Sequence, residues 1–277
     1  MREIIVSRQN PLVKEVCSLL EKKHRRSMKL FRFDGVKLFS EALLCGLDIE
    51  YIVLSEGANE ACKDAVALAV KEGKLSEEAV YRVSVGVFEK ISEENAPEGI
   101  VTVAKELFGV KEKIGGLELP SLIKEGDLIL MAESLRDPGN LGTVIRSCAA
   151  LGIEKLVLSS DCADIYNPKT IRAAMGGLFR LDICILGAEE MPSAIRALRG
   201  YGRKIYATAL KQNSVDISAL SLRKGDCFVI GNEGHGLSGA VVEACDASCI
   251  IPMRAGCESL NASAAAAICI WETVRAL

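Results

Sequence analysis

Histidine and tryptophan are nearly absent from this chain of 277 residues, which has two histidines and one tryptophan. His24 and His235 lie far apart in the sequence, and no Cys-x-x-Cys pair occurs. Structural zinc sites are usually built from closely spaced cysteine and histidine ligands, so we expect no metal. No stretch approaches the roughly 18 consecutive apolar residues of a membrane span, so we also expect no membrane contact.

Cysteine, in contrast, is plentiful. The chain has eleven cysteines, an odd number, and most lie within apolar runs, as do Cys148, Cys184, Cys227 and Cys269. Such thiols behave as small buried hydrophobic groups, and disulfides persist mainly in oxidising compartments. The sequence starts with Met1, Arg2 and Glu3, so charges occur at once, and the apolar core that a signal peptide needs does not follow. We therefore expect reduced thiols and a cytoplasmic protein.

Two nucleotide-binding patterns have a glycine spacing that differs from the one at positions 231, 234 and 236. These three glycines match neither the dinucleotide fingerprint G-x-G-x-x-G nor the P-loop pattern G-x-x-x-x-G-K-[ST]. A glycine-rich turn of the usual methyltransferase type does not follow an early strand either. A nucleotide-dependent oxidoreductase therefore loses its main support, and its bound ligand would be visible by absorbance.

The hydrophobic content, 49% of the residues, is enough for a large core and two domains. Within residues 1–106, apolar runs at 48–55, 79–84 and 99–105 predict strands, and 59–72 predicts a helix. We expect this part to be a small α/β domain. The following stretch, 107–126, has glycine and proline punctuation that is typical of a linker.

Residues 127–277 show a regular alternation of predicted strands and helical segments. The predicted strands lie at 127–133, 155–160, 181–186, 204–209, 226–232 and 247–253. This alternation is typical of a parallel sheet with helices on both faces. In open sheets of this kind, ligands bind beyond the carboxyl ends of the strands.

The net charge of −3 is unevenly distributed. Residues 1–40 contain ten Lys or Arg and four Asp or Glu, which leaves −9 for the rest of the chain. The densest basic stretch, EKKHRRSMK at 21–29, is either an ordinary solvated helix face or a surface that neutralises RNA phosphates. The residues that we assign to RNA contact are Lys22, Lys23, Arg25, Arg26 and Arg172.

Three polar or glycine-rich stretches follow predicted strands in the second half. The first, LRDPGNLGTVIR, includes Asn140, which we expect to be the N-cap of a helix that runs to about Leu151. On that helix Arg146 points away from the apolar face. Arg146 is either a solvent-exposed arginine or a residue that meets an RNA phosphate or ribose above the strand end.

The second stretch, FVIGNEGHGLS at 228–238, has three glycines that allow a ligand to approach the backbone closely. Glu233 in this loop either binds local amides or belongs to the site, and we interpret His235 as a variable loop residue.

The third stretch is IIPMRAGCESLNASAAAA at 250–267. Ser259 is a candidate N-cap for the C-terminal helix, which is a purely structural alternative to a role in the site. Asn261 can both donate and accept hydrogen bonds, as the positioning of a ribose hydroxyl requires.

Together these stretches resemble the three motifs of the SpoU (TrmH-like) RNA ribose methyltransferases of the SPOUT superfamily. The matching residues are Asn140, Arg146, Glu233, Ser259 and Asn261. The resemblance continues through DIYNPKTIRAAMGGLFRL at 164–181, where Ala174 stands in place of a frequent serine. SRQNPLVKEV and LFRFDGVKLFSEAL are similar to the RNA-binding extension of some members, with Asp34 in place of the more usual glutamate.

The resemblance implies an α/β protein in which a smaller N-terminal RNA-binding domain (1–106) precedes a knotted parallel-sheet SPOUT methyltransferase domain (127–277). It also implies a homodimer, with S-adenosylmethionine as the methyl donor. The residues that it assigns to the cofactor are Thr208, Ala209, Leu210, Gly231, Ile251, Met253 and Leu260. The acceptor would be a ribose 2′-hydroxyl of structured RNA, and the N-terminal extension favours large-subunit ribosomal RNA over transfer RNA.

Arg146 matches the residue that is proposed to activate the hydroxyl in this family. Because arginine stays protonated at neutral pH, we interpret it as a positive clamp that lowers the pKa of the hydroxyl and holds the adjacent phosphate. Asn140 and Glu233 would fix the arginine or the ribose, with Glu233 acting in its own or the partner subunit. Ser259 and Asn261 would order the loop around the cofactor. A transfer RNA methyltransferase and a non-catalytic RNA-binding protein of the same fold are the alternatives.

Overall fold

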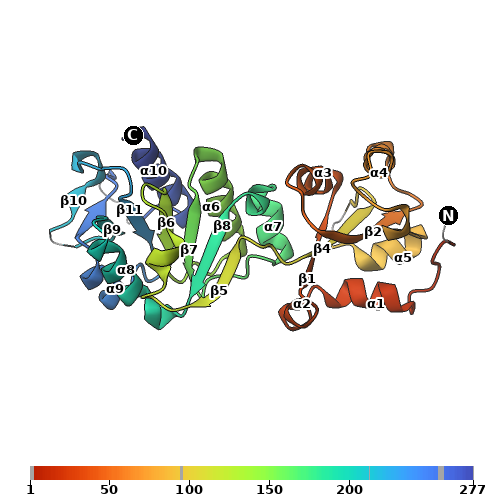
Figure 1. Ribbon diagram of the computed structural model, residues 1–277, viewed down its shortest axis with the longest axis horizontal. Coiled ribbons are helices and arrows are strands. Elements are labelled where there is room, and N and C mark those ends of the chain that lie inside the picture. The colour runs from red at the N-terminus through yellow and green to blue at the C-terminus, as the bar shows by residue number, and fades with distance from the viewer. Residues whose placement is uncertain (1–2, 94–95, 212, 255–258, 277) are drawn as a thin grey trace. The chain divides into compact units, whose positions relative to one another are not determined.

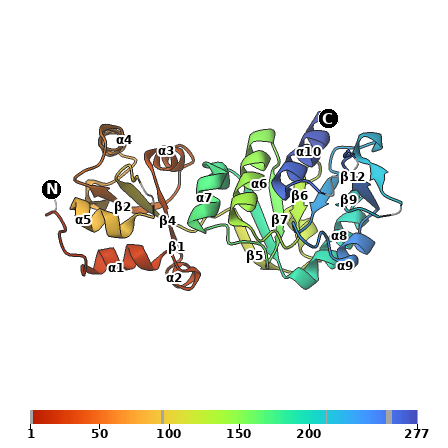
Figure 2. The ribbon, with the colours of Figure 1, turned by 180° about the vertical axis from the view of Figure 1, so that it is seen from behind.

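The computed structural model describes residues 3–93, 96–211, 213–254 and 259–276. They form two compact units whose elements are labelled in Figures 1 and 2. The first unit comprises Met1–Leu107 with Tyr166–Arg172, and the second comprises Phe108–Ile165 with Ala173–Leu277. None of the described helices is long and apolar enough to cross a membrane.

The first unit contains a four-stranded mixed sheet in the order β1-β4-β2-β3. Its strands are β1 (Leu30–Asp34), β2 (Ile49–Ser55), β3 (Val80–Val83) and β4 (Ile100–Lys105). Its helices include α1 (Pro11–Ser18), α2 (Lys22–Met28), α3 (Val36–Leu44), α4 (Glu60–Lys71) and α5 (Val85–Ile91). β4 runs antiparallel to β1 and β2, whereas β2 and β3 are parallel. The predicted strands at 48–55, 79–84 and 99–105 and the predicted helix at 59–72 are confirmed as β2, β3, β4 and α4.

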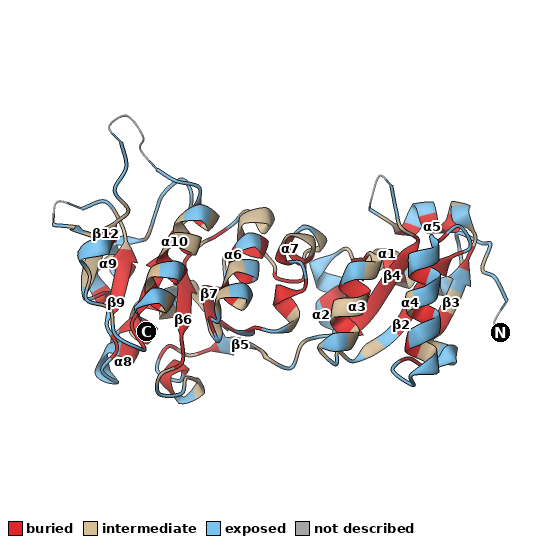
Figure 3. Ribbon diagram, turned by 90° about the horizontal axis from the view of Figure 1, so that it is seen from above, coloured by how far each residue is buried: buried red, intermediate tan, exposed pale blue. Residues whose placement is uncertain are grey.

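Both faces of this sheet are covered, as the buried colouring of its strands in Figure 3 indicates. On one face Val16 of α1 and Phe88 of α5 pack against Val53 and Val103. On the other face Phe39 of α3 and Val66 of α4 join a separate cluster with strand residues such as Ile52. Because successive side chains of a strand point to opposite faces, each strand contributes residues to two hydrophobic cores, one on each face of the sheet.

A buried ion pair lies inside this unit. Nη2 of Arg32 donates to Oδ1 of Asp34 over 2.7 Å, and the two residues are 1% and 7% exposed. Nη1 of Arg32 also donates to the carbonyl oxygen of Ile91 at the end of α5, and Asp34 accepts from the Ser92 hydroxyl. Asp34, the position at which the family more often has glutamate, thus ties β1 to α5.

The basic helix α2 is exposed at Lys22, Lys23 and Arg26 but not at Arg25. Arg25 is 4% exposed, and its Nη1 donates to the carbonyl oxygens of Leu19 and Leu20 at 2.7 and 2.6 Å. This burial corrects the expectation that Arg25 lies on a phosphate-contacting surface. Its guanidinium instead satisfies the carbonyls where the chain passes from α1 to α2.

The second unit contains an eight-stranded sheet in the order β10-β12-β9-β11-β6-β7-β8-β5. All of the pairings described between its strands are parallel. The strands are β5 (Val110–Ile114), β6 (Ile129–Ala132), β7 (Lys155–Ser159), β8 (Asp182–Leu186), β9 (Ile205–Thr208), β10 (Val215–Asp216), β11 (Cys227–Ile230) and β12 (Ala247–Ile250). The helices are α6 (Pro138–Leu151), α8 (Met191–Gly200), α9 (Gly239–Ala244) and α10 (Ala262–Arg275). Helix α7 (Pro168–Ala174) belongs to the first unit as far as Arg172 and to the second unit from Ala173 on. The parallel sheet and its six predicted strands are confirmed.

The interpretation of 107–126 as a linker is wrong where β5 lies. β5 pairs with β8 as the edge strand of the large sheet. Its sequence, VKEKI, exposes its three central charged residues, as edge strands often do to discourage further pairing. Only Val110 and Ile114 of the five residues of β5 are apolar, so the hydrophobic pattern of the sequence did not indicate a strand there.

The strand order reverses next to β6, where a ligand site is expected. The chain runs from β6 through β7 to β8 on one side, whereas β9, β11 and β12 lie on the other side. Helices α8 and α9 cover one face of the sheet through Ile195 and Val241, and α6 packs along α10. A crevice at the carboxyl ends of strands next to such a switch point is the usual ligand site of open α/β sheets.

Candidate functional site

Helix α6 starts earlier than the sequence suggested, and this frees Asn140. The N-cap is Asp137, whose Oδ1 accepts from the backbone N–H of Asn140 over 2.8 Å, and Pro138 opens the helix. Asn140 is therefore the third helical residue, and the prediction that it is the N-cap is wrong. Because Asp137 satisfies the helix end, the Asn140 side chain is available for contacts outside the helix.

Three of the five predicted catalytic side chains form a continuous chain of hydrogen bonds. Nδ2 of Asn140 donates to Oε1 of Glu233 over 2.8 Å. Nδ2 of Asn261 donates to Oδ1 of Asn140 over 2.9 Å. Asn140 and Glu233 are separated by 93 positions in the sequence, and Asn140 and Asn261 by 121, yet the three side chains meet beyond the strand ends. We refer to this arrangement as the Glu233–Asn140–Asn261 chain.

The direction of this chain is set by helix α10. Asn261 is the N-cap of α10, and its Oδ1 accepts from the backbone N–H groups of Ser263 and Ala264. An amide whose oxygen accepts from the helix must turn its nitrogen the other way, toward Asn140. The Asn140 amide is oriented in the same manner, so the chain ends on the Glu233 carboxylate, which can only accept when it is ionised.

The structure corrects the alternative role of Ser259. Asn261, and not Ser259, caps the C-terminal helix. Ser259 instead lies in the segment before the helix, exposed, at the wall of the cleft described below. Ala255–Glu258 of the same motif lie outside the described residues.

Arg146 is not part of this hydrogen-bonded chain. It is exposed on the outer side of α6 with Thr143 and Ala150, while Leu141 and Val144 are buried, as the helical periodicity predicted. Arg146 follows Asn140 by six residues, so the two side chains point in directions about 120° apart around the axis of α6. Among the described residues, no hydrogen bond or ion pair joins Arg146 to the Glu233–Asn140–Asn261 chain.

A cleft of about 1010 Å³ opens at the carboxyl ends of β9, β11 and β12. The cleft is lined by Glu233, Ser259 and all seven residues predicted for the cofactor, Thr208, Ala209, Leu210, Gly231, Ile251, Met253 and Leu260. Cofactor pockets in proteins typically measure roughly 300 to 1,000 Å³ and combine apolar walls with a few polar groups. Leu210, Met253 and Leu260 are 82%, 42% and 41% exposed, so apolar side chains stand uncovered around the opening. This lining fits a ligand of nucleoside size that has both an apolar ring and polar groups.

A buried thiol closes part of the cleft wall. Cys249 of β12 lines the cleft but is only 2% exposed, and burial raises the pKa of its thiol to about 12. The thiol therefore stays protonated at neutral pH and acts as a small apolar group. No cluster of three or more His, Cys, Asp or Glu that could hold a metal occurs within the described residues.

The segment from Gly231 to Ser238 forms a loop, the 231–238 loop, and its shape requires glycine at position 231. A Cβ atom at Gly231 would lie 2.5 Å from the carbonyl carbon of Gly236 and 2.6 Å from the backbone nitrogen of Leu237. Such distances are shorter than any normal contact, so a side chain there would push the two ends of the loop apart. The loop is closed by hydrogen bonds in both directions between the backbones of Asn232 and Gly236.

Several polar residues that hold this loop were missed at the level of sequence. Asn232 donates from Nδ2 to the carbonyl oxygen of Ser134, and its Oδ1 accepts from the backbone N–H groups of Gly234 and His235. Glu133 accepts two hydrogen bonds from Ser238. A signal for Glu133 existed, since it is a carboxylate directly after an apolar strand in front of the first motif.

The remaining residues predicted for RNA contact have different surroundings. Lys22, Lys23 and Arg26 are exposed on α2. Arg172 is half-buried, and its Nη1 lies 4.0 Å from a carboxylate oxygen of Glu93. Arg172 is thus partly neutralised, whereas α2 presents a concentrated positive charge.

Comparison with known proteins agrees with the motifs. The protein-family model described as SpoU rRNA Methylase family matches residues 127–271 of this chain, and the family model of the MRM3-like substrate binding domain matches residues 10–102. The 23S rRNA (guanosine(2553)-2′-O)-methyltransferase RlmP of Bacillus subtilis is 30% identical over 268 residues, which are 96% of this chain and 97% of that protein. A 23S rRNA (uridine(2479)-2′-O)-methyltransferase of Streptomyces viridochromogenes is 30% identical over 188 residues, 65% of this chain and 66% of that protein.

Solved structures show the same relationship over nearly the whole chain. The AdoMet-bound rRNA methyltransferase from Sinorhizobium meliloti has a TM-score of 0.81 and 29% sequence identity, and covers 99% of this chain and 98% of that one. A structure described as an RNA 2′-O ribose methyltransferase has a TM-score of 0.79, 29% identity and 99% coverage of both chains. The three motifs, the parallel sheet and these matches agree, and the chain belongs to the SpoU rRNA methylase family.

Proposed function

We propose that this protein transfers a methyl group from S-adenosylmethionine to a ribose 2′-hydroxyl of large-subunit ribosomal RNA. The observation that carries the proposal is the Glu233–Asn140–Asn261 chain, which borders a cleft lined by all seven residues expected to hold the cofactor. The names of the relatives support ribosomal RNA, since two of them are 23S rRNA 2′-O-methyltransferases.

The cofactor would be held by the strand ends and loops that line the cleft. Leu210, Met253 and Leu260 offer uncovered apolar surface to a ring, and the backbone at Gly231 can approach the ligand closely. Bound S-adenosylmethionine supplies an electrophilic methyl group on a sulfonium centre. The task of the protein is then to align the hydroxyl and raise its nucleophilicity.

Arg146 is the residue that we assign to the hydroxyl. Its guanidinium is permanently charged, so it acts as a clamp on the phosphate next to the acceptor ribose and favours the ionised form of the hydroxyl. Asn140 and Asn261 hold Glu233 in a fixed orientation, and the second carboxylate oxygen of Glu233 is not used by that chain. In this proposal that oxygen accepts from the ribose or from an arginine. Ser259 contributes a hydroxyl at the cleft wall.

Formation of a homodimer is predicted from the family resemblance. Because Arg146 is exposed on α6 and forms no hydrogen bond or ion pair with Glu233 within one chain, we propose that a second subunit brings its Arg146 to the neighbouring cleft. The knot in the chain and a cytoplasmic location are further predictions from the family resemblance. In this proposal residues 1–106 capture the RNA, with α2 supplying Lys22, Lys23 and Arg26 for phosphate contact.

The test uses the full-length protein with S-adenosylmethionine that carries a labelled methyl group. Ribosomal RNA and transfer RNA from cells that lack the gene serve as separate substrates, and the products are digested to nucleosides. We expect label in one 2′-O-methylated nucleoside of the ribosomal RNA. Mapping of alkali-resistant phosphodiesters in RNA with and without the gene then locates the position.

Other results would separate the alternatives. Label in transfer RNA alone would support the transfer RNA enzyme, and label on a base would overturn the ribose mechanism. RNA binding without any transfer would indicate a non-catalytic RNA-binding protein of the same fold.

A further inference from the structure

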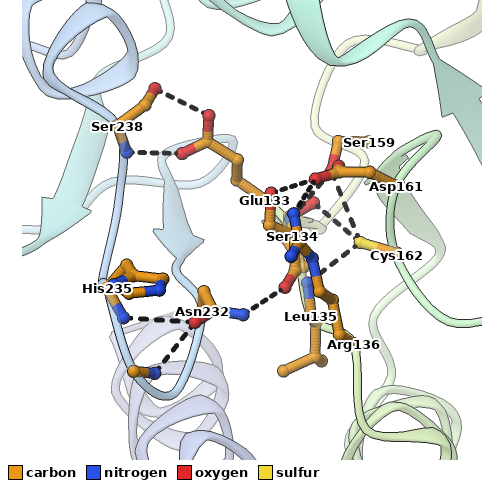
Figure 4. Close-up of polar contacts among 12 residues, drawn as sticks. Glu133, Ser134, Leu135, Arg136, Ser159, Asp161, Cys162, Asn232, His235 and Ser238 are labelled. Atoms are coloured by element: carbon orange, nitrogen blue, oxygen red, sulfur yellow. Dashed lines mark hydrogen bonds and ion pairs between the residues drawn. The ribbon is translucent and has the colours of Figure 1, made fainter.

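Glu133 is a buried carboxylate directly after β6, and it is committed to a single partner. It is 7% exposed. Its Oε2 accepts from the backbone N–H of Ser238 over 2.8 Å, and its Oε1 accepts from the Ser238 hydroxyl over 2.7 Å (Figure 4). Within the described part of the chain, no lysine, arginine or histidine forms an ion pair with it. A buried carboxylate without a cation depends on such hydrogen bonds to offset its desolvation.

Ser238 is the far end of the 231–238 loop and the N-cap of α9. Its Oγ also accepts from the backbone N–H of Val241 at the start of α9. The near end of the loop is held by the hydrogen bond from the Glu133 backbone N–H to the carbonyl oxygen of Ile230. One residue at the end of β6 therefore anchors the loop at both of its ends.

Between these anchors the loop has little freedom. Asn232 and Gly236 are joined by two backbone hydrogen bonds of 3.1 and 2.9 Å, and Gly231 packs directly on Gly236. Asn232 also bonds to the carbonyl oxygen of Ser134, the residue after Glu133. A displacement of Ser238 must then be transmitted to Glu233, which lies between these fixed points.

We propose that Glu133 is a positioning residue that sets the shape of the cofactor cleft by clamping Ser238. Glu133 does not line the cleft, whereas Gly231, Glu233, Gly234 and Gly236 of the loop do. The effect on the ligand is therefore indirect and passes through the loop. This inference rests on the proposed function in one respect, namely that the cleft binds S-adenosylmethionine.

The experiment compares four variants of the full-length protein. Glu133→Leu keeps the size of the side chain but leaves both Ser238 donors unpaired, and Ser238→Ala removes only the hydroxyl. Glu133→Gln is the conservative variant, because its amide oxygen can accept from the Ser238 N–H and its nitrogen can donate to the hydroxyl. Glu154→Leu is the matched control, since Oε2 of Glu154 accepts from the backbone N–H of Leu128 over 2.7 Å at the opposite end of β6.

The readouts are the Kd for S-adenosylmethionine by titration calorimetry, the melting temperature, and kcat and KM for methyl transfer. We expect Glu133→Leu to raise the Kd and the cofactor KM by about tenfold or more, because two hydrogen bonds to a charged group are lost. Ser238→Ala should raise them by about threefold, and Glu133→Gln and the Glu154→Leu control by less than about twofold. Glu133→Leu combined with Ser238→Ala should be no worse than Glu133→Leu alone, since both remove the same clamp.

Two outcomes would overturn the role of Glu133. A lower melting temperature of Glu133→Leu with an unchanged Kd would make its role purely structural. A Glu133→Gln variant as weak as Glu133→Leu would mean that the negative charge itself is needed, and not the clamp. If the wild-type protein binds no S-adenosylmethionine, the proposed function fails first and the role of Glu133 in the cleft fails with it.

Discussion

The two units of this protein use buried polar residues differently. In the first unit Arg32 and Asp34 are paired inside a mixed sheet and bind the end of α5. In the second unit two buried polar residues, Glu133 and Ser159, lie at the carboxyl ends of β6 and β7, and their partners are loops. Other buried polar residues of this unit, Asp127, Arg203 and Asp226, lie just before β6, β9 and β11, at the opposite ends of the strands. All of the described strand pairs of that sheet are parallel, so the carboxyl ends gather at one edge.

This difference distinguishes polar groups that hold a fold together from polar groups that shape a site. A mixed sheet spreads its strand ends over both edges, and a buried ion pair there stabilises the unit itself. A parallel sheet collects its loops, and a buried carboxylate at the shared edge controls loop geometry. Substitutions in the first unit should therefore act on stability or RNA capture, and those that release the 231–238 loop in the second unit should act on cofactor binding.

The largest effect is expected from Asp34→Ala. The substitution leaves Arg32, 1% exposed, as an unpaired buried charge, and we expect the free energy of unfolding to fall by about 3 to 5 kcal/mol. Urea denaturation measures this loss. The affinity of the folded protein for S-adenosylmethionine should not change. A loss of cofactor affinity at equal folding would break the distinction between the two units.

Gly231→Ala should have the next largest effect, and it should act at the cleft. The added Cβ would lie 2.5 Å from the Gly236 carbonyl carbon, so the 231–238 loop must open. We expect a stability loss of about 1 to 3 kcal/mol, as for other overpacked sites, together with a cofactor Kd that is raised by more than the melting temperature alone explains. Gly234→Ala is a suitable control, because its nearest neighbour would be the Asn232 side chain at 3.5 Å. Equal Kd values for the two variants would contradict the account.

The basic helix α2 allows capture of RNA to be separated from folding. Replacing Lys22, Lys23 and Arg26 together with Ala should weaken RNA binding. The slope of the logarithm of the binding constant against the logarithm of the salt concentration should become less steep by about two to three. Arg25→Ala should instead lower the melting temperature, because Arg25 is buried against the carbonyls of Leu19 and Leu20. Filter binding at several salt concentrations measures the slope. An unchanged slope in the triple variant would remove α2 from the RNA surface.

The smallest effect is expected from Asp161→Asn, and it should depend on pH. Burial by itself raises the pKa of the Asp161 carboxyl, but hydrogen bonds from Ser134, Ser159 and Arg136 outweigh burial and hold this pKa below its usual value. A carboxyl with a lowered pKa stabilises the folded state above the pKa of the unfolded chain and loses this contribution as the pH falls through its folded value. Wild type should therefore be more stable than Asp161→Asn at pH 7, and the difference should shrink in acid. A difference that grows in acid would contradict this assignment.

The core of the site region could be predicted from sequence because it follows periodicity. The helical spacing of Leu141, Val144 and Ile145 identified the buried face of α6 and, by exclusion, the outward position of Arg146. Apolar runs likewise identified β6, β9, β11 and β12, whose carboxyl ends carry the cleft. These features depend on local pattern alone.

Helix ends and polar contacts between distant segments could not be predicted in the same way. Asp137 and Asn140 are both good capping residues, and only the position of Pro138 in the first turn indicated that Asp137 is the cap. The same ambiguity between Ser259 and Asn261 was resolved by the bonds of Asn261 to Ser263 and Ala264. The link between Glu133 and Ser238 spans 105 residues and leaves no periodic signal.

The most direct test of the central claim is the behaviour of Arg146→Ala. Single-turnover methyl transfer to ribosomal RNA and the Kd for S-adenosylmethionine are measured on the same preparation. Because Arg146 is exposed on α6 and does not line the cleft, we expect transfer to fall by about a hundredfold or more while the Kd stays within about twofold of wild type. Transfer at the wild-type rate, or loss of transfer and cofactor binding together, would contradict the assignment of Arg146 to the ribose hydroxyl.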